Sequence, residues 1–179
     1  MTPDDPAPRL VLPVGPRDHV QGSENAPVTL VEYGDYACPY CGVAYPIVKS
    51  IQRRIGDRLR FVFRNFPLVE AHPNAEHAAE AAEAAGAQGK FWEMHDLLYE
   101  NQDALEPEDL VQYARALKLD LKRFVLEMRE HVYAERVRED FRSGVRSGVN
   151  GTPTFFINGA RHNGPFDLES LLAAIEEAV

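Results

Sequence analysis

The spacing of apolar residues predicts a strand, a helix and a second strand in the first third of the chain. Residues 28–33 are mainly β-branched or aromatic, which is typical of a largely buried strand. Apolar residues then recur at helical spacing over 38–55, and Gly56 ends the predicted helix. Residues 59–64 alternate as a second strand does. Because crossovers of this kind are right-handed and join parallel strands, we expect a β-α-β unit.

The middle of the chain has only helical patterns. Residues 75–102 are Ala-rich and predict helices that are interrupted near Gly86 and Gly89. Residues 106–119 begin with an acidic, Pro-containing first turn, and 120–148 continue as one or two amphipathic helices. This stretch therefore predicts an all-helical insertion after the second strand.

The C-terminal segment returns to strand-like patterns. Residues 151–159 predict a strand, and 160–165 a short partner for it across an Asn158-Gly159 hairpin turn. Residues 167–179 predict a final amphipathic helix with an acid-rich start. The order β-α-β, helices, β-β-α indicates an α/β fold with a small mixed sheet.

The length of 179 residues indicates one domain with a large insertion. Residues 1–22 hold five prolines and predict a mostly irregular arm, with a short edge strand at 10–14. We expect residues 23–70 and 149–179 to form the two parts of one α/β domain, and residues 71–148 to form the helical insertion between them.

Composition limits the classes of function. Charged residues make up 26% and hydrophobic residues 45% of the chain, as in folded globular proteins. The 28 acidic and 19 basic side chains give a net charge of -9, which disfavours nucleic-acid binding. No segment approaches the roughly 20 apolar residues that span a bilayer, so we expect no membrane insertion. The first residues lack a signal-peptide pattern, which predicts a cytoplasmic protein as written, or a periplasmic or extracytoplasmic one if a leader was trimmed.

Both cysteines lie at the start of the first predicted helix, in Cys38-Pro39-Tyr40-Cys41. With Cys38 as the N-cap, Pro39 takes the first helical position and Cys41 the third, which brings the two sulfur atoms together. Free N–H groups and the helix dipole favour a thiolate at Cys38. We therefore predict Cys38 as the attacking nucleophile and Cys41 as the resolving thiol, with Pro39 and Tyr40 tuning the redox potential.

Three other interpretations of the cysteine pair remain open. A structural disulfide would close a very short loop, with a stabilisation of roughly 2 kcal/mol. A zinc site would need two further ligands such as His72 and His77, although the spacing from Cys41 is long for a compact finger. A metal cluster bridging a dimer is the third. The β-α-β setting favours the redox dithiol. We therefore expect no cofactor and no resident metal. We expect His72, His77 and His95 to be surface or packing residues.

The ordered motifs resemble those of DsbA-like thiol-disulfide oxidoreductases, over residues 23–179. These motifs are the strand that leads into Cys-Pro-Tyr-Cys, the helical block after the second strand, and Thr152-Pro153 before the third strand. The resemblance implies a thioredoxin-like fold with a helical insertion, in which Cys38 is the reactive thiolate and Cys41 resolves the mixed disulfide.

The same resemblance implies roles for residues outside the cysteine pair. Thr152-Pro153 matches a cis-proline pair that packs against the active-site disulfide, with the Thr152 backbone pairing with a substrate strand; a trans proline that opens a strand is the alternative. Glu32 matches a buried acid that exchanges the Cys41 proton; a solvent-facing carboxylate on an edge strand is the alternative. Pro39 and Tyr40 complete the expected substrate-binding surface.

The implied activity is that of a protein disulfide oxidoreductase. Its partners would be protein thiols or disulfides and an external redox partner that recycles the dithiol, and we expect a monomer. Pro-Tyr is also the dipeptide of glutaredoxins, so a glutathione-linked reductase stays open, as does a chaperone-like or metal-binding protein. Whether the protein is an oxidase, a reductase or an isomerase stays open as well.

Overall fold

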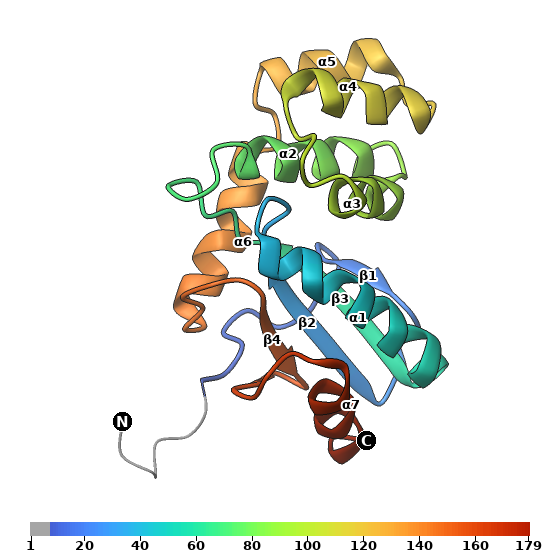
Figure 1. The fold of residues 1–179 in the computed structure, drawn as a ribbon, viewed down its shortest axis with the longest axis vertical. Coiled ribbons are helices and arrows are strands. Elements are labelled where there is room, and N and C mark those ends of the chain that lie inside the picture. Colours follow the sequence, from blue (N-terminus) through green and yellow to red (C-terminus); the bar gives the residue numbers. More distant parts are fainter. Residues whose placement is uncertain (1–7) are drawn as a thin grey trace.

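A mixed sheet lies at the centre of the protein, whose structure is a computed structural model that describes residues 8–179 (Figure 1). The strand order is β1-β3-β2-β4-β5, and β2 pairs in parallel with β3, while the other pairs are antiparallel. This arrangement confirms the predicted β-α-β unit and the C-terminal hairpin. The strands are β1 His19–Gln21, β2 Val28–Gly34, β3 Leu59–Asn65, β4 Thr154–Ile157 and β5 Ala160–Arg161.

Both faces of the sheet are covered. On one face, α1 (Pro39–Ile55) and α7 (Leu168–Glu177) share a hydrophobic core with the strands, α2 and α3. On the other face, Phe141 of α6 and Leu10 and Val14 of the N-terminal arm pack against a second core. Because β2 is buried on both sides, it reads as a nearly continuous apolar run. A short 3-10 turn, η1 (Gly56–Arg58), joins α1 to β3.

Five helices stand between β3 and β4 and confirm the predicted helical insertion. Figure 1 shows most of this block beyond the end of the sheet where the chain enters α1, with α6 running back along the sheet. The predicted break in the Ala-rich segment is present, with Gly89 at φ +78°. Residues 120–148 form two helices. The helices are α2 Ala75–Gly86, α3 Phe91–Glu100, α4 Pro107–Ala116, α5 Leu121–Arg129 and α6 Ala134–Arg146.

The edge strand predicted at residues 10–14 is wrong. The edge strands are β1, which pairs antiparallel with β3, and β5, to which the arm adds only an isolated bridge between Arg9 and Ala160. Two backbone hydrogen bonds join the arm to the β4–β5 hairpin, from the Leu10 N–H to the Gly159 carbonyl and from the Arg161 N–H to the Pro8 carbonyl. Beyond Leu10, backbone groups of the arm bind side chains. The carbonyls of Leu12 and Pro13 accept hydrogen bonds from Arg64 at 2.9 and 3.2 Å, so they are not available for a strand ladder.

Arg64 is buried, although the alternation of β3 places it among polar positions. Its guanidinium donates two hydrogen bonds to Asp18, at 2.8 and 3.0 Å, and one to the Tyr33 hydroxyl at 3.0 Å. Burial opposes ionisation of Asp18, but the hydrogen bond and charge of Arg64 outweigh it and lower the pKa of that carboxyl. The N-terminal arm is thereby held against the sheet by a buried ion pair.

Candidate active site

Cys38 and Cys41 occupy the first turn of α1 as the sequence predicts. Cys38 is the N-cap with extended backbone angles, φ −76° and ψ 121°, and Pro39 follows at the start of the helix. Both cysteines are free thiols and both are buried. The structure therefore holds a dithiol at the positive end of a helix, on the side of the sheet that faces the helical block.

The environment of Cys38 favours its thiolate. The strongest contribution is a hydrogen bond from the Cys41 thiol, which lowers the pKa of Cys38. Burial raises this pKa, whereas Thr152 and the backbone N–H groups of Cys41 and Tyr40 lower it further. Together they lower the pKa of Cys38 from its ordinary value of 9.0 to about 5. A thiol with this pKa is almost fully ionised at pH 7, which is the state that attacks disulfides.

Cys41 has the opposite tendency. Burial raises the pKa of its thiol well above the usual range, and the hydrogen bond to Cys38 and the charge of Glu32 raise it further. A hydrogen bond of 3.5 Å from the Asp35 backbone N–H to the Cys41 sulfur opposes this shift. The two sulfur atoms therefore differ chemically, with Cys38 ionised and Cys41 protonated at neutral pH.

The Thr152–Pro153 loop supplies the other wall of the site. The peptide bond between these residues is cis, so the alternative of a trans proline is wrong. In the protonated state the Cys38 thiol donates a hydrogen bond of 3.5 Å to the Thr152 carbonyl oxygen. The chain positions Cys38 and Thr152 together although 114 residues separate them. The expected pairing of Thr152 with substrate stays a prediction.

Glu32 lies behind the cysteines on β2, the central strand, and its residue is 2% exposed. The alternative of a solvent-facing carboxylate on an edge strand is therefore wrong. Burial, with a smaller contribution from the charge of Cys38, raises the pKa of Glu32 from 4.5 to about 8. One carboxyl oxygen, Oε1, has no hydrogen-bond partner within residues 8–179. A buried carboxyl of this kind is suited to hold and release a proton near neutral pH.

We expect Glu32→Gln to stabilise the protein increasingly as the pH rises. The folded state raises the pKa of Glu32 to about 8, so folded protein binds this proton more tightly than unfolded protein, and the cost of ionisation grows between pH 4.5 and 8. The gain in free energy of unfolding should be below about 0.5 kcal/mol at pH 4.5 and about 4 kcal/mol at pH 8. Denaturant unfolding at both pH values measures it.

The exposed Glu24→Gln change is the matched control, since Glu24 lies on the surface before β2. It should leave the free energy of unfolding unchanged at both pH values. A gain for Glu32→Gln that is the same at pH 4.5 and pH 8 would contradict a buried carboxyl with a raised pKa.

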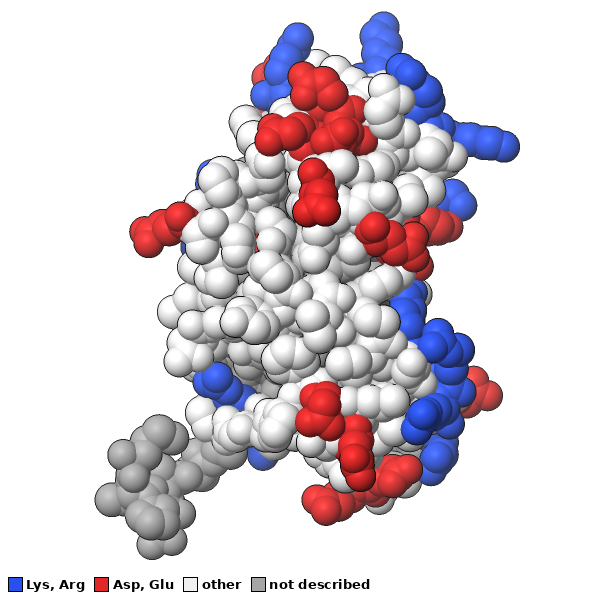
Figure 2. Space-filling view, viewed as in Figure 1, with Lys and Arg blue, Asp and Glu red and all other residues white. Residues whose placement is uncertain are grey.

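Tyr40 and Val43 expose apolar surface beside the active-site cysteines. Their exposed fractions are 68% and 58%. Figure 2 shows few charged side chains across the middle of this face, where the helical block meets α1, while acidic and basic residues gather toward its two ends. A charge-poor apolar surface of this kind suits contact with non-polar segments of another chain.

Asp35 organises the loop before Cys38, and sequence reasoning did not identify it. Its carboxylate accepts hydrogen bonds from the backbone N–H groups of Ala37 and Leu68, at 2.8 and 2.9 Å. The same carboxylate pairs with His72 Nδ1 at 2.8 Å. Since its own N–H reaches Cys41, Asp35 links the dithiol to the chain that leaves β3. The short Gly-Asp-Tyr run before Cys38 gave no signal of this role.

Gln102 connects the helical block to the active-site turn. Its Nε2 donates hydrogen bonds to the carbonyl oxygens of Tyr36 and Cys38, at 2.8 and 2.9 Å. A Cβ atom at Gly42 would lie 2.0 Å from Gln102 Oε1, so a larger residue there would displace the Gln102 amide from these carbonyl groups. The polar side chain follows α3 in sequence, and nothing in the local pattern indicates this contact.

The two histidines considered as zinc ligands, His72 and His77, do not join the cysteines. His72 pairs with Asp35, and His77 lies beside Glu80 and His131 in the helical block. His95 is buried with its Nδ1 3.0 Å from the Tyr36 hydroxyl, which confirms it as a packing residue. Within residues 8–179, no group of three potential ligands that includes either cysteine lies close enough to share an ion. The geometry therefore does not support the zinc interpretation of the cysteine pair.

Comparison with known proteins gives two kinds of match. The sequence model of the family described as Thioredoxin matches residues 15–177. The crystal structure of oxidised BdbD from Bacillus subtilis superposes with a TM-score of 0.84 at 27% identity, covering 97% of this chain and 98% of that one. A thioredoxin-like oxidoreductase from Silicibacter pomeroyi DSS-3 gives 0.81 at 28% identity, covering 92% and 93%. These matches confirm the predicted thioredoxin-like fold.

A curated relative carries a name from a different class of protein. Na(+)/H(+) antiporter NhaA 3 of Salinispora tropica is 51% identical over 170 residues, which cover 94% of this chain and 26% of the relative. The chain thus spans about a quarter of the length of that relative. In the part of this chain that the structure describes, every helix is too short or too polar to cross a bilayer.

Proposed function

This chain belongs to the thioredoxin family and is DsbA-like, and we propose that it is a protein thiol-disulfide oxidoreductase that donates disulfides to protein thiols. The observation that carries the proposal is the asymmetric dithiol, with the pKa of Cys38 lowered to about 5 and that of Cys41 raised. Because folding stabilises the Cys38 thiolate, the reduced form of the protein is favoured, and the disulfide form readily passes its disulfide to another thiol pair.

The oxidised protein would react in two exchange steps. A substrate thiolate attacks Cys38 Sγ, a mixed disulfide forms, and the Cys38–Cys41 bond breaks with Cys41 as the leaving group. Glu32, with a pKa of about 8, gives a proton to the departing Cys41 thiolate. A second substrate thiolate then attacks the substrate sulfur, so Cys38 leaves as a thiolate. The substrate loses two electrons and the protein dithiol gains them.

The low pKa of Cys38 supports the direction of this exchange. A thiol of lower pKa leaves a mixed disulfide faster, and a stabilised thiolate favours the reduced form of the protein. Both effects favour transfer of the disulfide to the substrate. For the same reason we propose an oxidising, extracytoplasmic compartment for this activity. The chain contains two cysteines in all, so an external oxidant must restore the disulfide.

We propose that the substrates are extended, apolar segments of other proteins. Tyr40 and Val43 present apolar surface at the first turn of α1, and Thr152 lies across the site with its carbonyl oxygen at the Cys38 sulfur. The backbone of Thr152 would pair with the substrate strand, as β-strand addition does in other proteins. Side chains around the site would then contact the substrate with little charge selectivity.

The antiporter relative does not change this assignment. The matched segment is about a quarter of its length, while the thioredoxin family model and the BdbD structure cover almost all of this chain. We propose that the shared segment is a thioredoxin-like unit of that longer protein. Ion transport would then be carried by the remainder of the antiporter sequence.

Oxidation of a reduced peptide with two cysteines tests the proposed function. Oxidised protein should convert the peptide to its disulfide and become reduced in a 1:1 ratio, as mass spectrometry of both partners can show. Transfer only to glutathione, with none to the peptide, would favour a glutaredoxin-type reductase. No transfer to either thiol would refute the proposal.

A further inference from the structure

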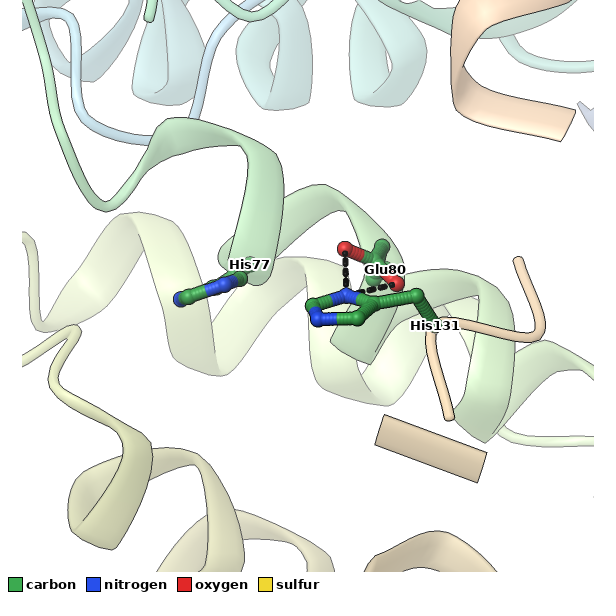
Figure 3. Close-up of side chains that lie close together, drawn as sticks. All are labelled: His77, Glu80 and His131. Atoms are coloured by element: carbon green, nitrogen blue, oxygen red, sulfur yellow. Dashed lines mark hydrogen bonds and ion pairs between the residues drawn. The ribbon is translucent and has the colours of Figure 1, made fainter. Parts of the chain in front are cut away.

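Three potential metal ligands meet in the helical block. His77 and Glu80 lie one turn apart on α2, and His131 lies in the connection between α5 and α6 (Figure 3). One ligand atom from each residue lies within 4.8 Å of the other two. Two imidazoles and a carboxylate form a ligand set that zinc and related transition metals accept. None of these residues hydrogen-bonds to Cys38 or Cys41.

His131 is held toward this cluster by both its backbone and its side chain. It has a φ of +51°, a region that a residue with a Cβ rarely adopts. Its Nδ1 lies 3.1 and 3.3 Å from the two carboxyl oxygens of Glu80. Figure 3 shows its other ring nitrogen on the side toward His77, and the two rings are stacked with centroids 5.7 Å apart.

Glu80 has an unusual environment for a carboxylate. Its side chain is 1% exposed, and within residues 8–179 its carboxyl oxygens hydrogen-bond to His131 alone. The side chain of His131 is 56% exposed, so the imidazole can rotate without disturbing the core. A bound cation would supply positive charge directly to a buried acid, which burial otherwise penalises.

The cluster is also accessible from solvent. His77 and His131 line a surface cavity of about 420 Å³, whose remaining wall is largely apolar residues of α4 and α5. Glu80 and His131 line a second hollow of about 420 Å³ on the side of Glu76 and Glu135. An ion can therefore reach the three side chains, and a water molecule can complete its coordination.

We propose that His77, Glu80 and His131 form a binding site for a divalent transition-metal ion, with Zn²⁺ as the best-fitting ion. Zinc–ligand bonds of about 2.0–2.2 Å place neighbouring ligand atoms roughly 3.3–3.5 Å apart. The three ligand atoms, which now lie within 4.8 Å of one another, would therefore move closer together on binding, and the exposed His131 imidazole has room to do so. The ion would tie α2 to the α5–α6 connection, which lies 51 residues further along the chain at His131. Its role would be to stabilise the helical block.

Zinc binding is best measured in a Cys38→Ser/Cys41→Ser protein, because thiols would otherwise compete for the ion. Isothermal titration with Zn²⁺ alone should show one site of micromolar affinity or tighter, and the thermal midpoint should rise by several degrees at saturating Zn²⁺. With Co²⁺ in place of Zn²⁺, visible absorption bands should report nitrogen and oxygen ligands.

Single changes of the surface ligands identify the site. His77→Ala and His131→Ala should each weaken Zn²⁺ binding at least about tenfold and remove the thermal shift. His162→Ala, an imidazole between β5 and α7, is the matched control and should bind Zn²⁺ as the parent does. Circular dichroism checks that each variant is folded. Zn²⁺ binding that survives His131→Ala, or no binding by the folded parent, would overturn the proposal.

Discussion

Cys38→Ser is expected to reduce the rate of disulfide transfer to a reduced peptide by on the order of 10³-fold or more. A serine at position 38 cannot form the Cys38–Cys41 disulfide or the mixed disulfide, and the chain contains two cysteines in all, so the variant has no disulfide to transfer. Stopped-flow or quenched-flow kinetics with the oxidised wild type as reference measures the loss.

Cys41→Ser is the matched variant for this experiment. It retains the attacking thiolate of Cys38 and a hydroxyl that can donate to it, but it has no thiol to resolve the mixed disulfide. Reduced Cys41→Ser protein mixed with a disulfide-containing peptide should therefore accumulate a covalent adduct at Cys38 that Cys38→Ser does not form. Equal adduct yields at the two cysteines would contradict the unequal roles of the sulfur atoms.

The reduction potential of the Cys38/Cys41 couple is expected to be oxidising and to depend weakly on pH. The folded pKa of Cys38 is lowered to about 5, so its thiolate stabilises the reduced form fully above pH 9 and loses this effect as the pH falls through 5. At pH 7 the stabilisation corresponds to about 2.7 kcal/mol, or roughly 60 mV relative to an ordinary thiol pair.

The pH dependence gives an internal control within one protein. Reduction takes up one proton when Cys38 remains a thiolate and two when both thiols are protonated. The potential should therefore fall by about 30 mV per pH unit between pH 5 and 8, and by about 59 mV per unit below pH 5. Equilibration with a glutathione redox buffer at each pH measures it. A slope near 59 mV throughout this range would refute a Cys38 pKa of about 5.

Local sequence signals were sufficient to predict the first turn of the active site. Cys38, Pro39 and Cys41 take the N-cap, first and third positions of α1. These positions lie within three residues of one another, so helix geometry alone places the three side chains. The position of Thr152-Pro153 came instead from the resemblance to DsbA-like proteins. No local rule brings two segments separated by 114 residues into contact.

The remaining features depend on how distant segments pack. Gln102 reaches the Cys38 carbonyl across 64 residues, and Arg64 binds Asp18 across 46. Neither side chain belongs to a motif. The alternation of β3 predicts only that Arg64 faces the opposite side of the sheet from the residues next to it. The edge strand expected at residues 10–14 failed for the same reason, since buried Arg64 takes the carbonyl groups that a strand would use.

The proposed mechanism depends most directly on the pKa of the Cys38 thiol. Reduced wild-type protein can be alkylated with iodoacetamide from pH 3.5 to 9, with mass spectrometry reporting the rate at Cys38 separately from Cys41. We predict that the rate at Cys38 rises with a midpoint near pH 5 and is constant above pH 7, while Cys41 stays unreactive. A midpoint near pH 9 at Cys38 would contradict the proposed mechanism.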